Sequence, residues 1–132
     1  MLAASMGDAT GAVPFSSYMT MPDRLRHEPE LIVAFTRALY RTQRWIAAHD
    51  AKAVAETIAP SFVDIPGPIR ERAVRRYLAQ GTWARAPLLR RPGYEYLVDI
   101  LLGGGFIHRR HRYQDLVDTT LAERAMQTLK EA

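Results

Sequence analysis

The chain has 132 residues, of which 48% are hydrophobic and 24% are charged, a balance typical of one folded globular domain rather than of a disordered chain. No apolar run reaches the roughly 18 to 20 uncharged residues that span a bilayer, so membrane insertion is not expected. The chain contains no cysteine, which excludes disulfides, thiol nucleophiles and cysteine-based metal sites.

The net charge of +4 is confined to the middle of the chain. Residues 68–112 carry ten Lys or Arg against three Asp or Glu, whereas the segments before and after them are slightly acidic. The densest basic run is 108–112 (HRRHR), a pattern that can indicate nucleic-acid binding. The run is short, contains no interleaved aromatic residues and is followed by Asp115 and Asp118. Nucleic acid is therefore not the expected partner, and a small basic nucleic-acid-binding protein is kept as an alternative.

The first residues of the chain predict a loop followed by a single strand. Residues 1–12 are interpreted as a loop or a truncated start, because Gly7, Gly11 and the following Pro14 are typical of a loop. They have neither the basic n-region nor the apolar h-region of a secretory signal peptide. As given, the chain would be expected to stay in the cytoplasm. Residues 13–21 (VPFSSYMTM) are rich in strand formers and are followed by Pro22. A lone strand has unpaired backbone groups, so its partners are expected to be missing or supplied by another copy.

The remainder predicts a mainly α structure with four to five helices. Asp50 is a plausible N-cap of a short second helix, and Gly81 is the expected C-cap of the third. Gly103, Gly104 and Gly105 follow a helix instead of leading from a strand into one, so they predict a helix end and not a phosphate loop. The expected helices cover residues 29–49, 51–59, 68–80, 93–102 and 121–130.

Apolar residues at helical spacing predict which face of each helix is buried. In helix 29–49 the expected buried face consists of Leu31, Phe35, Ala38, Leu39, Thr42 and Ile46. In helix 68–80 the expected inward line is Ile69, Ala73 and Tyr77, with Val74 and Leu78 beside it. In helix 93–102 the expected line is Tyr94, Leu97, Val98 and Leu101, and in the last helix it is Leu121, Ala125 and Leu129.

Residues able to support chemistry are few. Ser16 and Ser17 have no G-x-S-x-G context, and the paired carboxylates are typical of helix starts, so no catalytic residue and no cofactor are expected. His108 and His111 lack a third ligand at a suitable spacing, so no metal site is expected. Trp83 lies in a predicted loop, where an indole either fills a core or lines a ligand pocket, and the first interpretation is favoured.

Several short segments in a fixed order carry a resemblance to a known family. They are VPFSSY at 13–18, a Pro-Glu helix start at 29–30, RWIAAH at 44–49, IAP at 58–60, YLAQGTW at 77–83, GGFI at 104–107 and YQDLVD at 113–118. Over about residues 13–125 the chain resembles the C-terminal portion of the substrate-binding proteins of ABC importers in the nitrate, sulfonate, taurine and thiamine-pyrimidine group.

The resemblance implies a part of an α/β fold with two lobes, the type II periplasmic-binding-protein-like fold, in which a hinge closes the lobes on a small solute. Residues 13–132 would form the C-terminal segment of a solute-binding lobe, and would bind no solute alone. The implied partners are a small-molecule solute and an ABC permease, and the implied location is the periplasm or the outer face of the membrane. Phe15, Ser16 and Ser17, on the strand that returns past the cleft, and the loop residue Trp83 are then the candidate ligand-binding residues.

Two further expectations follow from the resemblance. The parent family includes proteins related to thiamine-pyrimidine synthases, so a fragment of such an enzyme is an alternative to a transport component. Lobe faces that lack their covering elements would expose apolar residues and a strand edge, so a homo-oligomer is a possible state.

Overall fold

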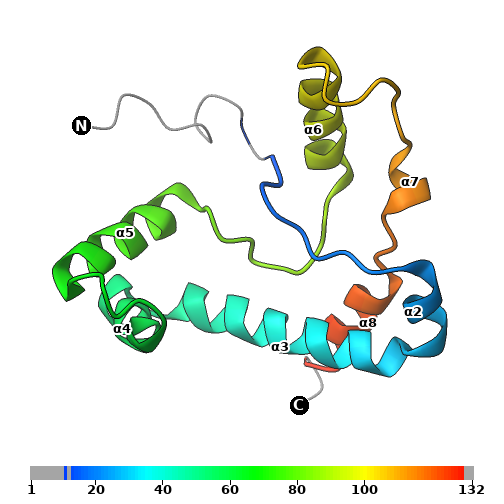
Figure 1. The fold of residues 1–132 in the computed structure, drawn as a ribbon. Helices are drawn as coiled ribbons and strands as arrows, with labels where there is room; N and C mark the ends of the chain where they lie inside the picture. Colours follow the sequence, from blue (N-terminus) through cyan, green and yellow to red (C-terminus); the bar gives the residue numbers. More distant parts are fainter. Residues whose placement is uncertain (1–10, 12, 130–132) are drawn as a thin grey trace.

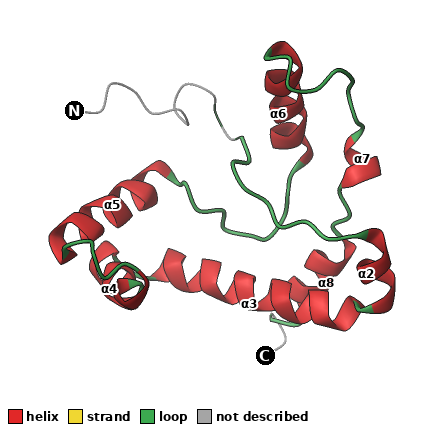
Figure 2. Ribbon diagram, viewed as in Figure 1, coloured by secondary structure: helices red, strands yellow, loops and turns green. Residues whose placement is uncertain are grey.

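The structure is a computed structural model that describes residue 11 and residues 13–129. Within this part, the chain is mainly α, as the sequence predicts, and no residue is in a strand (Figures 1 and 2). The elements in chain order are α2 (Pro22–His27), α3 (Pro29–Ala48), α4 (Ala51–Thr57), the 3-10 helix η1 (Ala59–Ser61), α5 (Gly67–Gln80), α6 (Arg91–Gly103), α7 (Tyr113–Leu116) and α8 (Thr120–Gln127).

The strand predicted over residues 13–21 is not formed. These residues have no regular secondary structure, and no backbone hydrogen bond among the described residues involves positions 14–20. A strand requires a neighbouring strand to accept and donate its hydrogen bonds, and none lies beside this segment in the described structure. Pro22 does not simply end the segment. It occupies the first turn of α2, where its fixed φ angle suits a helix and its missing N–H is not needed.

Helix α3 has the predicted extent but buries a different face. Its buried residue is Val33, while Leu31 and Phe35, at the centre of the predicted face, are 53% and 45% exposed. Leu39 and Ile46 of that face are half-buried. Helix α8 covers the Val33 side of α3, where Ala125 is completely buried and Arg124 pairs with Glu30. The part of the predicted face around Leu31 and Phe35 is therefore only partly covered, with the ring of Tyr18 5.0 Å from that of Phe35.

Helices α4 and α5 pack against each other around a small core. Asp50 caps α4 as predicted, since its carboxylate accepts a 2.8 Å hydrogen bond from the N–H of Ala53. Helix α4 ends at Thr57, and Pro60 lies inside η1. Gly81, at φ +63°, ends α5 as predicted, because the left-handed region favours glycine. The core consists of Ala51, Val54, Ala55 and Val74.

The predicted inward line of α5 is wrong in part. Val74 is buried and Leu78 packs against the core, but Ile69 and Tyr77 are 48% and 46% exposed. Helix α4 packs on the side of α5 that carries Val74 and Leu78. The neighbouring apolar line, with Ile69 and Tyr77, therefore remains about half exposed.

Helices α6 and α8 agree better with the sequence. Tyr94 and Val98 of α6 are buried, and Leu97 and Leu101 are half-buried. The glycines end α6 as expected, with the N–H of Phe106 hydrogen-bonded back to the carbonyl of Leu101 at 2.9 Å. At the start of α8 the Asp118 carboxylate accepts a 2.9 Å hydrogen bond from the N–H of Thr120. Helix α8 ends at Gln127, before the predicted end at residue 130, because residues 128 and 129 form a turn. Residues 1–10, 12 and 130–132 lie outside the described residues.

The packed elements fall into three groups joined by irregular linkers: α2 with α3 and α8, α4 with η1 and α5, and α6 with α7. The ribbon is correspondingly open, with α4 and α5 at one end of the long helix α3 and α2 and α8 at the other (Figure 1). The fold presents helices without enclosing a large common core.

Candidate functional site

The sequence-predicted ligand residues lie in two different environments. Phe15, Ser16 and Ser17 are exposed on the irregular segment before α2, with Phe15 fully exposed. Trp83 is half-buried and packs against the core of the α4–α5 pair, with its ring 5.4 Å from that of Tyr77 in an edge arrangement. Trp83 thus occupies the core-filling position. Neither of the two best-formed hollows in the described structure is lined by any of these four residues.

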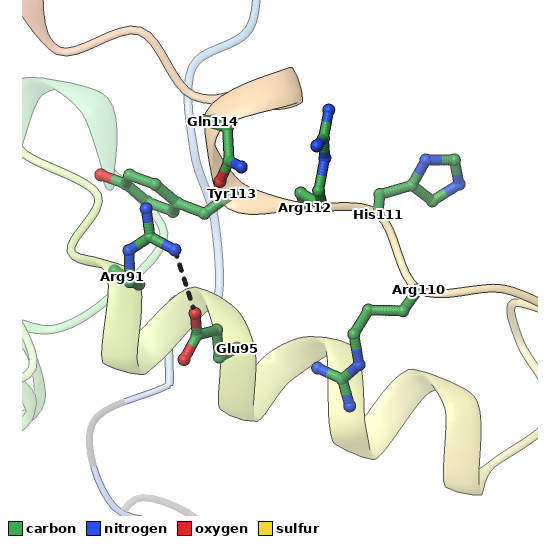
Figure 3. A pocket seen from close by; sticks show the side chains of 7 residues that line it. All are labelled: Arg91, Glu95, Arg110, His111, Arg112, Tyr113 and Gln114. Atoms are coloured by element: carbon green, nitrogen blue, oxygen red, sulfur yellow. Dashed lines mark hydrogen bonds and ion pairs between the residues drawn. The ribbon is translucent and has the colours of Figure 1, made fainter.

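One hollow, of about 250 Å³, lies between α6 and the segment that leads into α7 (Figure 3). Hydrogen bonds from two tyrosine hydroxyls connect the segments around it. The hydroxyl of Tyr94 donates a 3.0 Å hydrogen bond to the carbonyl of His111, and the hydroxyl of Tyr113 donates to the carbonyl of Leu89. The lining residues are Arg91, Glu95, Arg110, His111, Arg112, Tyr113 and Gln114.

A cation–π contact closes one end of this hollow. The guanidinium of Arg91 lies 4.9 Å from the centre of the Tyr113 ring, and an arginine over an aromatic face is held there by the negative face of the ring. Figure 3 also shows the 3.4 Å contact between Arg91 and Glu95, one turn further along α6. The sequence did not point to this pair, since Arg91 and Tyr113 are far apart along the chain, and the only available signal was the local density of arginine.

Each arginine that lines the hollow has a carboxylate partner. Arg110 pairs with Asp99, and Arg112 makes two 2.8 Å hydrogen bonds to Asp115. The hydrogen bond from Arg112 lowers the pKa of Asp115, and the same carboxylate raises the pKa of Arg112. The positive charge of the 108–112 run is therefore largely compensated locally. This arrangement favours a structural role for Arg110 and Arg112 over the binding of phosphates.

The second hollow, also about 250 Å³, lies between α4 and α5. Arg70 forms part of its wall and is committed to the backbone: Nε donates to the carbonyl of Ala55 and Nη1 to that of Ile65, both at 2.8 Å. Its remaining walls are formed by Lys52, Glu56, Gly67, Pro68 and Glu71 together with Ala55. Both hollows are open to solvent, whereas a tight small-molecule site buries most of the surface of its ligand.

The described residues contain no group of three or more His, Asp or Glu placed to hold a metal ion. Among the helices that the structure describes, none is both long enough and apolar enough to cross a membrane. The chemistry available at the two hollows is recognition by hydrogen bonding and charge.

Comparison with known proteins gives one informative relative. No protein-family model matches the chain, and no solved structure matches it significantly. The chain is 30% identical, over 123 residues, to a Bacillus subtilis (strain 168) protein named "Putative binding protein YtlA". The chain is similar to a binding protein. The match takes in 93% of this chain but spans only 37% of the length of the relative. The name of the relative is that of a binding protein, which agrees with the binding role expected from the sequence and specifies no solute.

Proposed function

We propose that this chain is the C-terminal portion of a solute-binding protein that serves an ABC importer, for a small solute of the nitrate, sulfonate, taurine or thiamine-pyrimidine class. The observation that carries the proposal is the similarity, over nearly the whole chain, to a protein named as a binding protein. The open helical arrangement, in which both described hollows are open to solvent, supports a part of a binding site rather than a complete one.

In this proposal the solute is held where the described helices meet the remainder of the fold. Phe15, Ser16 and Ser17 are free to contact it, because their side chains are exposed and engaged in no described hydrogen bond. Serine hydroxyls both donate and accept hydrogen bonds, so they suit an oxyanion or a pyrimidine ring. Closure of two lobes on the solute would present the closed form to the permease, outside the cytoplasmic membrane.

Uptake by the source cells tests the proposal. Deleting the coding sequence should lower the uptake of one labelled solute among nitrate, taurine, alkylsulfonates and the thiamine pyrimidine several-fold, and the intact gene should restore it. Restoration by a gene carrying Ser16→Ala and Ser17→Ala should be weaker, whereas Arg76→Ala, at an exposed position of α5 that lines neither hollow, serves as the control. Uptake of all four classes at the original rate after deletion would contradict the proposal.

Calorimetric titration supplies a second test. The isolated 132-residue chain should bind none of these solutes measurably, because it presents only part of the pocket. Tight binding of any of them by the isolated chain would show that the site is complete within these residues.

A further inference from the structure

Three arginines on one side of α3 have no carboxylate partner in the described structure. Arg37, Arg41 and Arg44 follow one another at four and three positions, the spacing of neighbouring side chains on one helix face. All three are exposed, and no ion pair among the described residues includes them. Glu30, the one acidic residue of α3, lies two turns before Arg37 and pairs with Arg124. We call Arg37, Arg41 and Arg44 the arginine ridge.

Other helical arginines are compensated within their own helix. Arg75 and Arg91 each pair with a glutamate one turn away. The arginine ridge instead places like charges one turn apart, which destabilises a helix as long as nothing neutralises them. Arg72 and Arg76 of α5 are a second exposed pair at this spacing without an ion pair in the described structure, and they provide a matched control. An anionic partner would remove the repulsion along the ridge.

An aromatic ring lies on each side of the arginine ridge. At about 3.6 residues per turn, Tyr40 and Trp45 fall at the two edges of the sector of α3 that carries the ridge. The guanidinium of Arg44 lies 5.9 Å from the centre of the Tyr40 ring, within the range of a cation–π contact. Both aromatic side chains are half-buried. Tyrosine and tryptophan with arginine beside them are the residue types enriched where lipid headgroups meet water.

The geometry of the ridge distinguishes between kinds of anionic partner. No ridge residue lines either of the two hollows, so the ridge does not enclose a small anion. Single-stranded nucleic acid is held in a basic groove with its bases stacked on aromatic faces, but here Arg44 already lies over the ring of Tyr40. Helix α3 is unbroken (Figure 1), and it presents the three guanidinium groups along a line that rises about 10 Å. An extended anionic surface fits this arrangement.

We propose that the arginine ridge docks α3 on an anionic phospholipid surface, with the guanidinium groups on the lipid phosphates and Tyr40 and Trp45 at the level of the headgroups. A guanidinium donates two parallel N–H groups to a phosphate, which a compact ammonium does not. Each basic residue near an anionic membrane strengthens binding by about five-fold, so the association is weak, reversible and sensitive to salt. The proposal concerns a surface of α3 and does not depend on the solute-binding role.

Sedimentation with lipid vesicles tests the proposal. The full chain is mixed with vesicles of phosphatidylglycerol and phosphatidylcholine, or of phosphatidylcholine alone, and the bound fraction is measured over a salt series. We expect binding to the anionic vesicles only, weakening as the salt concentration rises. Arg37→Gln together with Arg41→Gln should lower the vesicle affinity by roughly 20-fold, at about five-fold for each arginine. Arg72→Gln together with Arg76→Gln removes the same charge and should lower it by less than about two-fold, because charges away from the contact are screened.

Three results would overturn the proposal. Equal binding to both kinds of vesicle, or to neither, would show that the ridge does not recognise anionic headgroups. Equal losses in the two double variants would show that binding follows the overall charge of the chain and not the ridge. A fluorescent single-stranded oligonucleotide is titrated in parallel, and binding to it that the Arg37 and Arg41 substitutions abolish, without binding to vesicles, would assign the ridge to nucleic acid.

Discussion

At the scale of single residues, the side chain of Arg70 on α5 connects this helix to α4 and to the segment that follows η1. Its guanidinium donates to the carbonyls of Ala55 and Ile65 at 2.8 Å and lies 3.4 Å from that of Phe62. The Ala55 carbonyl lies in the last turn of α4, where the helix leaves acceptors without intrahelical donors, and the carbonyls of Phe62 and Ile65 follow η1. A rigid planar fork with several N–H groups can serve them together, which a lysine cannot do.

Arg70→Ala should destabilise the α4–α5 pair by about 1–3 kcal/mol, because it removes charge-assisted hydrogen bonds and takes the Arg70 donor from the partly buried carbonyl of Ala55. Urea denaturation followed by far-UV circular dichroism measures the loss. Arg76→Ala, on an exposed position of the same helix, is the matched control and should change the stability by less than about 0.5 kcal/mol. Equal effects of the two substitutions would show that Arg70 contributes only as a surface charge.

The contact between α8 and α3 should weaken as the pH falls into the acid range. The hydrogen bond from Arg124 lowers the pKa of Glu30 from its ordinary 4.5, and hydrogen bonds from Thr120 lower the pKa of Asp118 from 3.8. A carboxylate with a lowered folded-state pKa stabilises the fold fully above its ordinary pKa, and this stabilisation is lost as the pH falls through the lowered value. Amide exchange of α8 should therefore accelerate, relative to the intrinsic rates, below about pH 4.5.

Glu30→Gln isolates the ion pair in that experiment. The variant should show a weaker acid dependence of α8 protection, leaving the part that comes from Asp118. Glu56→Gln, on α4 in another packing group, should leave the α8 profile as it is in the unaltered chain. A profile for Glu30→Gln identical to the original would mean that the pair with Arg124 does not hold α8.

The most reliable predictions from the sequence were those of helix caps, which depend only on nearby residues. Asp50 as an N-cap and Gly81 as a C-cap depend on neighbours within a few residues, and both predictions are confirmed. Arg70 could not be predicted in the same way, since its acceptors are fixed by the packing of α5 against α4. The Arg91–Tyr113 contact has the same origin, because a turn and a linker separate its two elements.

At the scale of elements, the sequence predicted where the helices lie along the chain, but it did not predict which helices pack against each other. Periodicity identified α3, α5, α6 and α8, but for α3 and α5 it marked an apolar face that the described neighbours do not cover. An amphipathic pattern predicts that one face of a helix will be buried, but it does not predict which element will cover that face. The strand expected at residues 13–21 has the same limitation, because strand pairing is a property of two segments.

Trp83→Ala should destabilise the α4–α5 pair by about 2–3 kcal/mol, somewhat less than the cost for a fully buried tryptophan, because the indole is half-buried against that core. Thermal unfolding followed by circular dichroism measures the loss. Tyr96→Ala, on the exposed side of α6, is the control and should have little effect. An unchanged stability of Trp83→Ala together with reduced solute uptake would instead assign Trp83 to the ligand pocket.

At the scale of the whole molecule, the open arrangement predicts distinctive solution behaviour for the isolated chain. A compact chain of 132 residues has a radius of gyration of about 14 Å. Small-angle scattering should give a larger value, a concentration-dependent mass, or both, and a dye that binds apolar surface should fluoresce in its presence. A monomer of about 14 Å that unfolds in one sharp transition would contradict the open arrangement.

The length of α3 has a mechanical consequence. Its 20 residues extend about 30 Å, and the α4–α5 pair is attached at one end while α2 and α8 grip the other. A rigid rod held at one end amplifies rotation, so a tilt of about 10° at the gripped end would carry the pair through about 5 Å. A small rotation of α3 near Glu30 and Arg124 would therefore displace Trp83 and its surroundings by much more than it displaces α8, as a lever does.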